Sequence, residues 1–226
     1  MDIEKSRHRW EDPLLTGLTI LLLVMMFVVA PLQAIGAFGF QVFELLLAIM
    51  LVAGVFVISG SRTAVAAMLV ALVMIITAAV LRIRSPSILD LNLFAGAWLI
   101  VGVTLAWAVA RAIFAPGRVT YHRIVGAVLL YLTVAIIFAA FYTFIGTLQP
   151  DAFANMKVED SPKLATQLIY FSFATMTTTG YGDISPLHPV ARALCNLEAI
   201  FGQLYPATLL ARLVTLEIAH RDEKDF

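Results

Sequence analysis

The stretch Thr177-Thr178-Thr179-Gly180-Tyr181-Gly182-Asp183 decides the fold of this 226-residue chain, because it places polar residues and glycines between two long apolar segments. Glycine adopts left-handed backbone angles about as readily as right-handed ones. Two glycines separated by one residue therefore let an extended strand alternate between the two, so that successive carbonyl groups point the same way. Such a strand can offer a row of backbone oxygens to a cation.

The composition is typical of a membrane protein. Hydrophobic residues make up 61% of the chain and charged residues 13%, whereas soluble domains carry roughly a quarter charged residues. The formal net charge is zero, so the charge balance does not indicate a nucleic-acid partner. The one cysteine, Cys195, cannot form an intramolecular disulfide, and we expect it to be a small residue facing the core or the lipid.

Six segments are long and apolar enough to cross a membrane, since a span needs roughly 17–25 residues. We expect them at about 14–30, 40–58, 63–81, 91–114, 124–145 and 190–218. The segment 163–176 is too short to span and leads directly into 177–183, which predicts a re-entrant helix. Irregular backbone at that depth is tolerated only where it is buried in protein or lines a water-filled path. The predicted fold is an all-α membrane protein with six transmembrane helices, a re-entrant helix and an extended strand.

These segments predict a four-helix bundle over 1–115, a linker over 116–123, a second membrane unit over 124–218 and a short charged tail over 219–226. Ten of the 15 Lys and Arg residues then lie on the side of the N-terminus. The positive-inside rule therefore places both termini in the cytoplasm, in a plasma or inner cell membrane. A cleaved signal peptide is the alternative for the first segment, but acidic residues offset its basic ones.

The order of elements over 124–218 resembles the pore domain of the tetrameric potassium channels: an outer helix, a short pore helix, the sequence T-x-T-T-x-G-Y-G-D and an inner helix. The run 177–183 matches the near-identical TVGYG filter motif of that family. The resemblance implies that dehydrated K⁺ is bound by the backbone carbonyls of Thr178, Thr179, Gly180 and Tyr181. It also implies passive K⁺ conduction by a homotetramer within membrane lipids.

The resemblance assigns the support of this filter to five further residues: Gly182, Asp183, Thr177, Tyr170 and Phe171. Many members of the family carry two tryptophans where this chain has Tyr170 and Phe171. Phe171 cannot donate the hydrogen bond that an indole N–H gives. Some relatives also have a glutamate at the position of Ala174. We therefore expect the outer filter to be held less rigidly, or by another partner, for which Glu198 and Asn196 are candidates.

The sixth segment carries other residues of interest. Buried ionisable residues in membrane segments are functional hypotheses by default, so Glu198 is a candidate for gating or pH sensing, with a structural hydrogen bond to a neighbouring helix as the alternative. Gly202 falls where pore-lining helices of the family often have a hinge glycine, and Pro206 follows one turn later. Proline kinks helices. The two predict a gating bend, and a fixed kink is the alternative.

The first four segments lack the charge pattern of a voltage sensor, which needs basic residues at every third position. No basic residue lies between Leu91 and Ala110, and Arg111 stands where an anchor at the cytoplasmic side is expected. We therefore do not expect steep voltage dependence. Gating would act through the membrane part, the short termini or a regulatory partner protein.

The chain offers no constellation typical of an enzyme, and its four histidines do not pair at ligand-like spacing. We therefore expect no cofactor, no transition-metal site and K⁺ as the only bound metal. Two alternatives to a potassium-selective channel stay open. One is a weakly selective cation channel on the same scaffold, and the other is a non-conducting subunit that modifies another channel.

Overall fold

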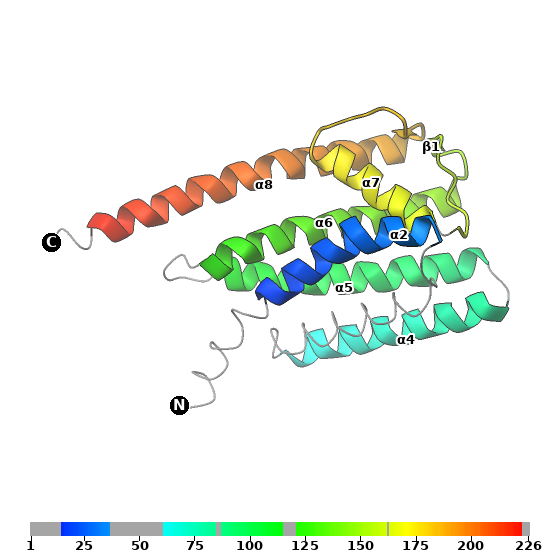
Figure 1. Cartoon of the computed structure of the whole chain (residues 1–226), viewed down its shortest axis with the longest axis horizontal. Helices are drawn as coiled ribbons and strands as arrows, with labels where there is room; N and C mark the ends of the chain where they lie inside the picture. The colour runs from blue at the N-terminus through cyan, green and yellow to red at the C-terminus, as the bar shows by residue number, and fades with distance from the viewer. Residues whose placement is uncertain (1–14, 37–60, 85–86, 115–120, 162, 223–226) are drawn as a thin grey trace.

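The computed structural model describes residues 15–36, 61–84, 87–114, 121–161 and 163–222, and nearly all of them are helical (Figure 1). The first helix runs over Leu15–Ala34. The elements are η1 (Met25–Val29), α2 (Ala30–Ala34), α4 (Arg62–Arg84), α5 (Ile88–Phe114), α6 (Tyr121–Leu148), β1 (Phe153–Ala154), α7 (Leu164–Met176), β2 (Ser185–Pro186) and α8 (Pro189–Asp222).

Four of the described helices are long and apolar enough to cross a membrane: Leu15–Ala34, Arg62–Ile83, Ile88–Arg111 and Ile124–Leu148. They correspond to the first, third, fourth and fifth predicted spans, and the second, at 40–58, lies outside the described residues. A helix also forms at the sixth, α8, but it is not among the four, because polar side chains interrupt its apolar sequence. The chain is thus a mostly helical membrane protein, and the total of six spans stays a prediction.

The first helix continues past the point where proline was expected to end it. We predicted its end at Ala30, before Pro31, but α2 carries the helix on to Ala34. The five residues before it form the π-helical turn η1. Proline removes one helical hydrogen bond and crowds the carbonyl four residues earlier, and a π-helical turn is one way in which a helix absorbs such a disturbance.

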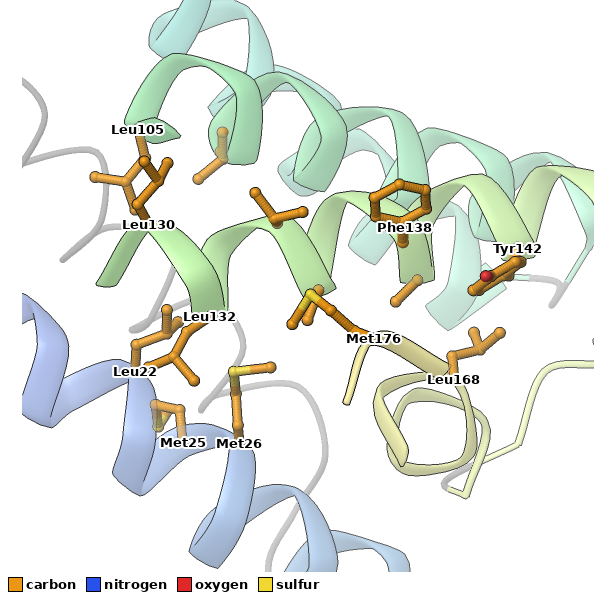
Figure 2. Close-up of a cluster of buried hydrophobic side chains, with 14 of the residues drawn as sticks. Leu22, Met25, Met26, Leu105, Leu130, Leu132, Phe138, Tyr142, Leu168 and Met176 are labelled. Carbon is orange, nitrogen blue, oxygen red and sulfur yellow. The ribbon is translucent and has the colours of Figure 1, made fainter. Parts of the chain in front are cut away.

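The helices pack in sequence order. Helix α5 lies between α4 and α6, and the chain reverses direction from each to the next (Figure 1). The first helix and α7 pack on another side of α6, and α8 runs beside α6 and α7. Figure 2 shows this centre, where Leu22 and Met26 of the first helix and Leu168 of α7 gather around α6.

A buried polar cluster ties α6, α7 and α8 together. Glu198 of α8 is 0% exposed. The Tyr142 hydroxyl donates to its Oε2 at 2.5 Å, and the Ser172 hydroxyl is hydrogen-bonded to its Oε1. Ser172 Oγ also lies 2.9 Å from the Ala135 carbonyl oxygen. Because a hydroxyl has one hydrogen for these two acceptors, a proton on the Glu198 carboxyl would satisfy every contact.

Gly202 is where α8 comes closest to α7. A Cβ atom at this position would stand 1.9 Å from the Met176 carbonyl oxygen and 2.7 Å from its carbon. Real Cβ atoms are never found so close to backbone, so only glycine fits without a shift of one helix. Met176, the last residue of α7, is itself 0% exposed. The end of α7 is therefore seated directly on the α8 backbone.

The buried cluster predicts an effect on stability. Ser172→Ala and Tyr142→Phe each remove a hydrogen bond to Glu198, and we expect each to lower the free energy of unfolding by about 1–3 kcal/mol. Thr133→Val is the control, because the Thr133 hydroxyl is also buried but donates only to Leu129 within α6. Thermal unfolding in detergent measures the difference. Equal losses in the control and in Ser172→Ala would contradict a special role of the cluster.

The close contact between α7 and α8 at Gly202 predicts a second effect on stability. Gly202→Ala forces α7 and α8 apart, and overpacking of this kind costs about 1–3 kcal/mol or more, so the melting temperature should fall by several degrees. The control is Gly17→Ala on the first helix, where an added Cβ meets nothing within 4 Å. A Gly202→Ala protein as stable as the Gly17→Ala protein would show that the contact is not tight.

Candidate functional site

The C-terminal end of α7 is closed by threonine side chains. The Thr175 hydroxyl donates to the Phe171 carbonyl at 2.8 Å, and the Thr177 hydroxyl to the Phe173 carbonyl at 2.6 Å. The Phe173 carbonyl also accepts from the Thr177 N–H at 2.9 Å, so the two hydroxyls add to the hydrogen bonds of the helix backbone. Thr178 follows with a φ of +55°, and a residue in the left-handed region ends a helix.

The backbone after α7 alternates in hand. Thr178, Gly180 and Gly182 have φ values of +55°, +58° and +80°, and the residues between them are not in the left-handed region. This is the alternation that directs carbonyl groups to one side of a strand. A Cβ added at Gly180 or Gly182 would meet nothing within 4 Å. Glycine is favoured at both positions by the backbone angle and not by a neighbour.

The far end of the run is braced from two sides. The rings of Tyr170 and Tyr181 stack, with centroids 5.9 Å apart and planes 13° apart. Asn155 Nδ2 donates to the Asp183 carbonyl at 2.8 Å. The antiparallel pairing of β1 with β2 holds the loop that carries Asn155 beside the end of the run.

The near end of the run contacts α8. Gln203 Nε2 donates to Thr178 Oγ1 at 3.0 Å, so a side-chain amide contacts the second residue after α7. Gln203 was not predicted from the sequence, although it lies between Gly202 and Pro206, where a bend is predicted. A polar amide next to the predicted hinge glycine was the signal that could have identified it.

Other predicted residues lie away from the run. Phe171 belongs to an aromatic cluster behind α7, with ring centroids 4.9 Å from Tyr142 and 5.5 Å from Phe153. Glu198 is hydrogen-bonded to α6 and α7, as expected for the structural role that was the alternative to gating or pH sensing. Its side chain does not reach the far end of the run. Asn196 is exposed on α8 in the single chain.

The predicted bend is anchored to α6. Helix α8 runs unbroken through Gly202 and Pro206. Between them, the Tyr205 hydroxyl donates to the Ala127 carbonyl at 2.9 Å, and its ring stacks on that of Tyr131 with centroids 6.0 Å apart. Together with the close contact of Gly202 with Met176, these contacts tie this stretch of α8 to α6 and α7.

An ion pair connects α4 to the segment that leads into α7. The Arg82 guanidinium makes two contacts with the Asp160 carboxylate, one of them from Nε at 3.2 Å. Both side chains are about one-fifth exposed, at 18% and 20%. Helix α7 is therefore positioned by the N-terminal helices as well as by α6 and α8.

Part of the chain is similar to known ion channel proteins. The family model described as "Ion channel" matches residues 127–218. The inward rectifier potassium channel Kirbac3.1 of Paramagnetospirillum magnetotacticum is 37% identical over 75 residues, which cover 33% of this chain and 23% of that protein. Protein LctB of Bacillus caldotenax is 29% identical over 119 residues, which cover 51% of this chain and 87% of that protein. No solved structure matches the chain significantly.

The matched region contains most of α6 and α8, all of α7 and the run 177–183. It therefore coincides with the part of the molecule in which the short helix α7, a backbone of alternating hand and the closely packed helix α8 come together. Residues 127–218 of this mostly helical membrane protein are thus similar to an ion channel domain, and a shorter part of the chain is similar to a potassium channel.

Proposed function

We propose that the protein is a potassium-selective channel subunit that conducts K⁺ passively. The observation that carries this proposal is the alternation of φ at Thr178, Gly180 and Gly182, within an ion channel domain. Such a backbone turns the carbonyls of Thr178, Thr179, Gly180 and Tyr181 toward one side, where they replace the hydration shell of K⁺. A relative that is named a potassium channel supports the choice of ion.

One strand cannot surround an ion, so four copies around an axis complete the site, most simply as a homotetramer. The run 177–183 is exposed in the single chain, as a surface that faces a shared axis must be. Helix α7 ends at Met176, and the C-terminus of a helix carries a partial negative charge. Four such ends would favour a cation below the strands.

The supporting residues take distinct roles in this proposal. Tyr170 replaces the missing tryptophan by stacking on Tyr181. Gly182 allows the turn at the outer mouth, and Thr177 holds the end of α7 and contacts Thr179, with their hydroxyl oxygens 2.7 Å apart. Phe171 fills the space behind α7 without a polar role.

Gating in this proposal does not rest on a voltage sensor. The only basic residue of α5 is Arg111, in its last turn. Because Gly202 and Tyr205 are anchored, a gate made by α8 would move beyond Pro206. In this proposal the protein lies in the plasma or inner cell membrane, with both termini in the cytoplasm. The run 177–183 then lies at the outer side of the membrane.

Gly180→Ala tests the filter. Alanine in the left-handed region costs about 1–2 kcal/mol, which would turn the carbonyls out of line, so selectivity for K⁺ over Na⁺ should be lost. Reversal potentials in opposed K⁺ and Na⁺ gradients across a planar bilayer give the readout. Gly36→Ala is the matched control, since Gly36 also has a positive φ, +79°, but lies outside the run. Unchanged K⁺ preference in Gly180→Ala would refute the assignment, and a wild-type protein without preference would favour the weakly selective channel.

Gln203→Leu tests the inner end of the run. A bound ion stabilises a protein by RT ln(1 + [ion]/Kd), so K⁺ should raise the melting temperature and Na⁺ should not. Loss of the Gln203 amide leaves the Thr178 hydroxyl without its donor. The Kd for K⁺, fitted to the rise of the melting temperature with K⁺ concentration, should then increase about threefold or more. Gln149→Leu, at an exposed position after α6, should leave it unchanged. Equal values for the two variants would exclude a role of Gln203 in ion binding.

A further inference from the structure

An apolar cavity of about 160 Å³ lies between the first helix, α5, α6 and α7. Its size is close to the roughly 150 Å³ of an engineered cavity that binds benzene. Apolar side chains form most of its wall, among them Leu22, Met26, Phe94, Trp98, Leu168 and Ile169. Figure 2 shows Leu22, Met26 and Leu168 on two of the elements that enclose it. The wall suits a hydrocarbon group.

One end of the cavity carries a donor that has no acceptor. Gln33 lines it, is 7% exposed, and its Nε2 atom has no hydrogen-bond partner among the described residues. A buried donor left unpaired costs about 1–3 kcal/mol. Of the other polar side chains of the wall, Thr143 donates to Ala139 and Arg82 pairs with Asp160, and the third is the small hydroxyl of Ser161. The site therefore calls for a neutral acceptor and not for an anion.

The polar end lies at the level where the helices end. Gln33 is in the last turn of the first helix and Arg82 in the last turn of α4, while Leu91 is in the first turn of α5. The end of α2, the end of α4 and the start of α5 lie at the end of the bundle that carries the loop before α7 (Figure 1). Leu22 lies about 16 Å deeper along the first helix, at 1.5 Å per residue. In a bilayer, hydrogen-bond acceptors lie at the level of the helix ends and hydrocarbon lies below them.

From these observations we propose that the cavity binds an acyl chain of a membrane lipid, whose ester carbonyl accepts a hydrogen bond from Gln33 Nε2. The chain enters with its carbonyl at the level of Gln33 and its methylene groups between Leu22 and Trp98. An ester supplies the one neutral acceptor that the site lacks. A membrane lipid surrounds the protein and carries its ester at the depth of Gln33. A free fatty alcohol is the other molecule that combines a hydrocarbon chain with a neutral acceptor.

The bound chain would act on α7. Leu164, Ala165, Leu168 and Ile169 of α7 line the cavity. The Thr166 hydroxyl donates to the Ala30 carbonyl at 3.0 Å, and so joins α7 to the first helix beside it. Helix α7 carries the run 177–183 at its end, so filling or emptying the cavity changes the packing of the helix that holds it. This consequence rests on the proposed channel function, whereas lipid binding does not.

Photolabelling of the full chain tests the binding. The protein is reconstituted in phosphatidylcholine vesicles that contain a trace of the same lipid with a photoreactive group in one acyl chain. Mass spectrometry should find the label concentrated at Met25, Met26, Phe94 and Ile169, above the level at exposed residues of α4 such as Val73. Ala140→Leu, in the cavity wall, should reduce this labelling several-fold, while Ala66→Leu on the exposed face of α4 should not. Uniform labelling, or equal labelling in both variants, would overturn the site.

A second comparison tests the carbonyl and its source. Unlabelled diester phosphatidylcholine should displace the label at least several-fold better than the diether lipid with the same head group and chains, which has no carbonyl. Gln33→Leu should remove this preference and retain the label, because it keeps the apolar wall. Equal competition in the wild type would overturn the role of Gln33. Displacement by dodecanol at a lower membrane concentration than by the diester lipid would overturn the lipid as occupant.

Potassium flux in the two kinds of vesicle tests the consequence. We expect wild-type flux to differ at least twofold between diester and diether lipids, and Gln33→Leu flux to be the same in both. Concentrated labelling with identical wild-type flux would overturn the effect on α7. A protein that conducts in neither lipid would contradict the channel proposal, and the labelling pattern would still decide the site.

Discussion

The close contact of α7 with the backbone of α8 is the one on which the rest of the region 127–218 depends. The missing side chain at Gly202 lets α8 approach the Met176 carbonyl, and this approach fixes the end of α7. One turn earlier on α8, Glu198 holds Ser172 of α7 from the same side. The residue after Gly202 then reaches Thr178. The same short piece of α8 therefore fixes both where α7 ends and how the following strand begins.

The elements with strong local signals were predictable from the sequence. The helix expected at 163–176 is found at Leu164–Met176, because its length and apolar character are properties of the segment itself. The need for left-handed angles at Gly180 and Gly182 follows from the residue type. The apolar segments around them also gave four helices of membrane-spanning length.

The contacts between segments distant in the sequence were not predictable. Thr178 adopts a positive φ, which a β-branched residue rarely does. The residues next to it in the sequence do not indicate this backbone angle. Gln203 meets Thr178 across 25 positions, and Glu198 meets Tyr142 across 56. Such pairs depend on how the helices rotate and cross, which hydrophobic patterns specify only coarsely. This is why the partners of Glu198 and the importance of Gln203 emerge only from the folded chain.

The π-helical turn η1 has a consequence for the whole end of the first helix. A π-helical turn closes its hydrogen bonds over one residue more than an α-helical turn, and each residue of an α-helix corresponds to about 100° of rotation. Every side chain after Val29 is therefore turned by about that angle relative to a regular helix of the same sequence. Without the turn, the side chain of Gln33 would point away from the cavity that it now lines. An irregularity of the backbone, and not an exchange of residues, gives this helix its one inward-facing amide.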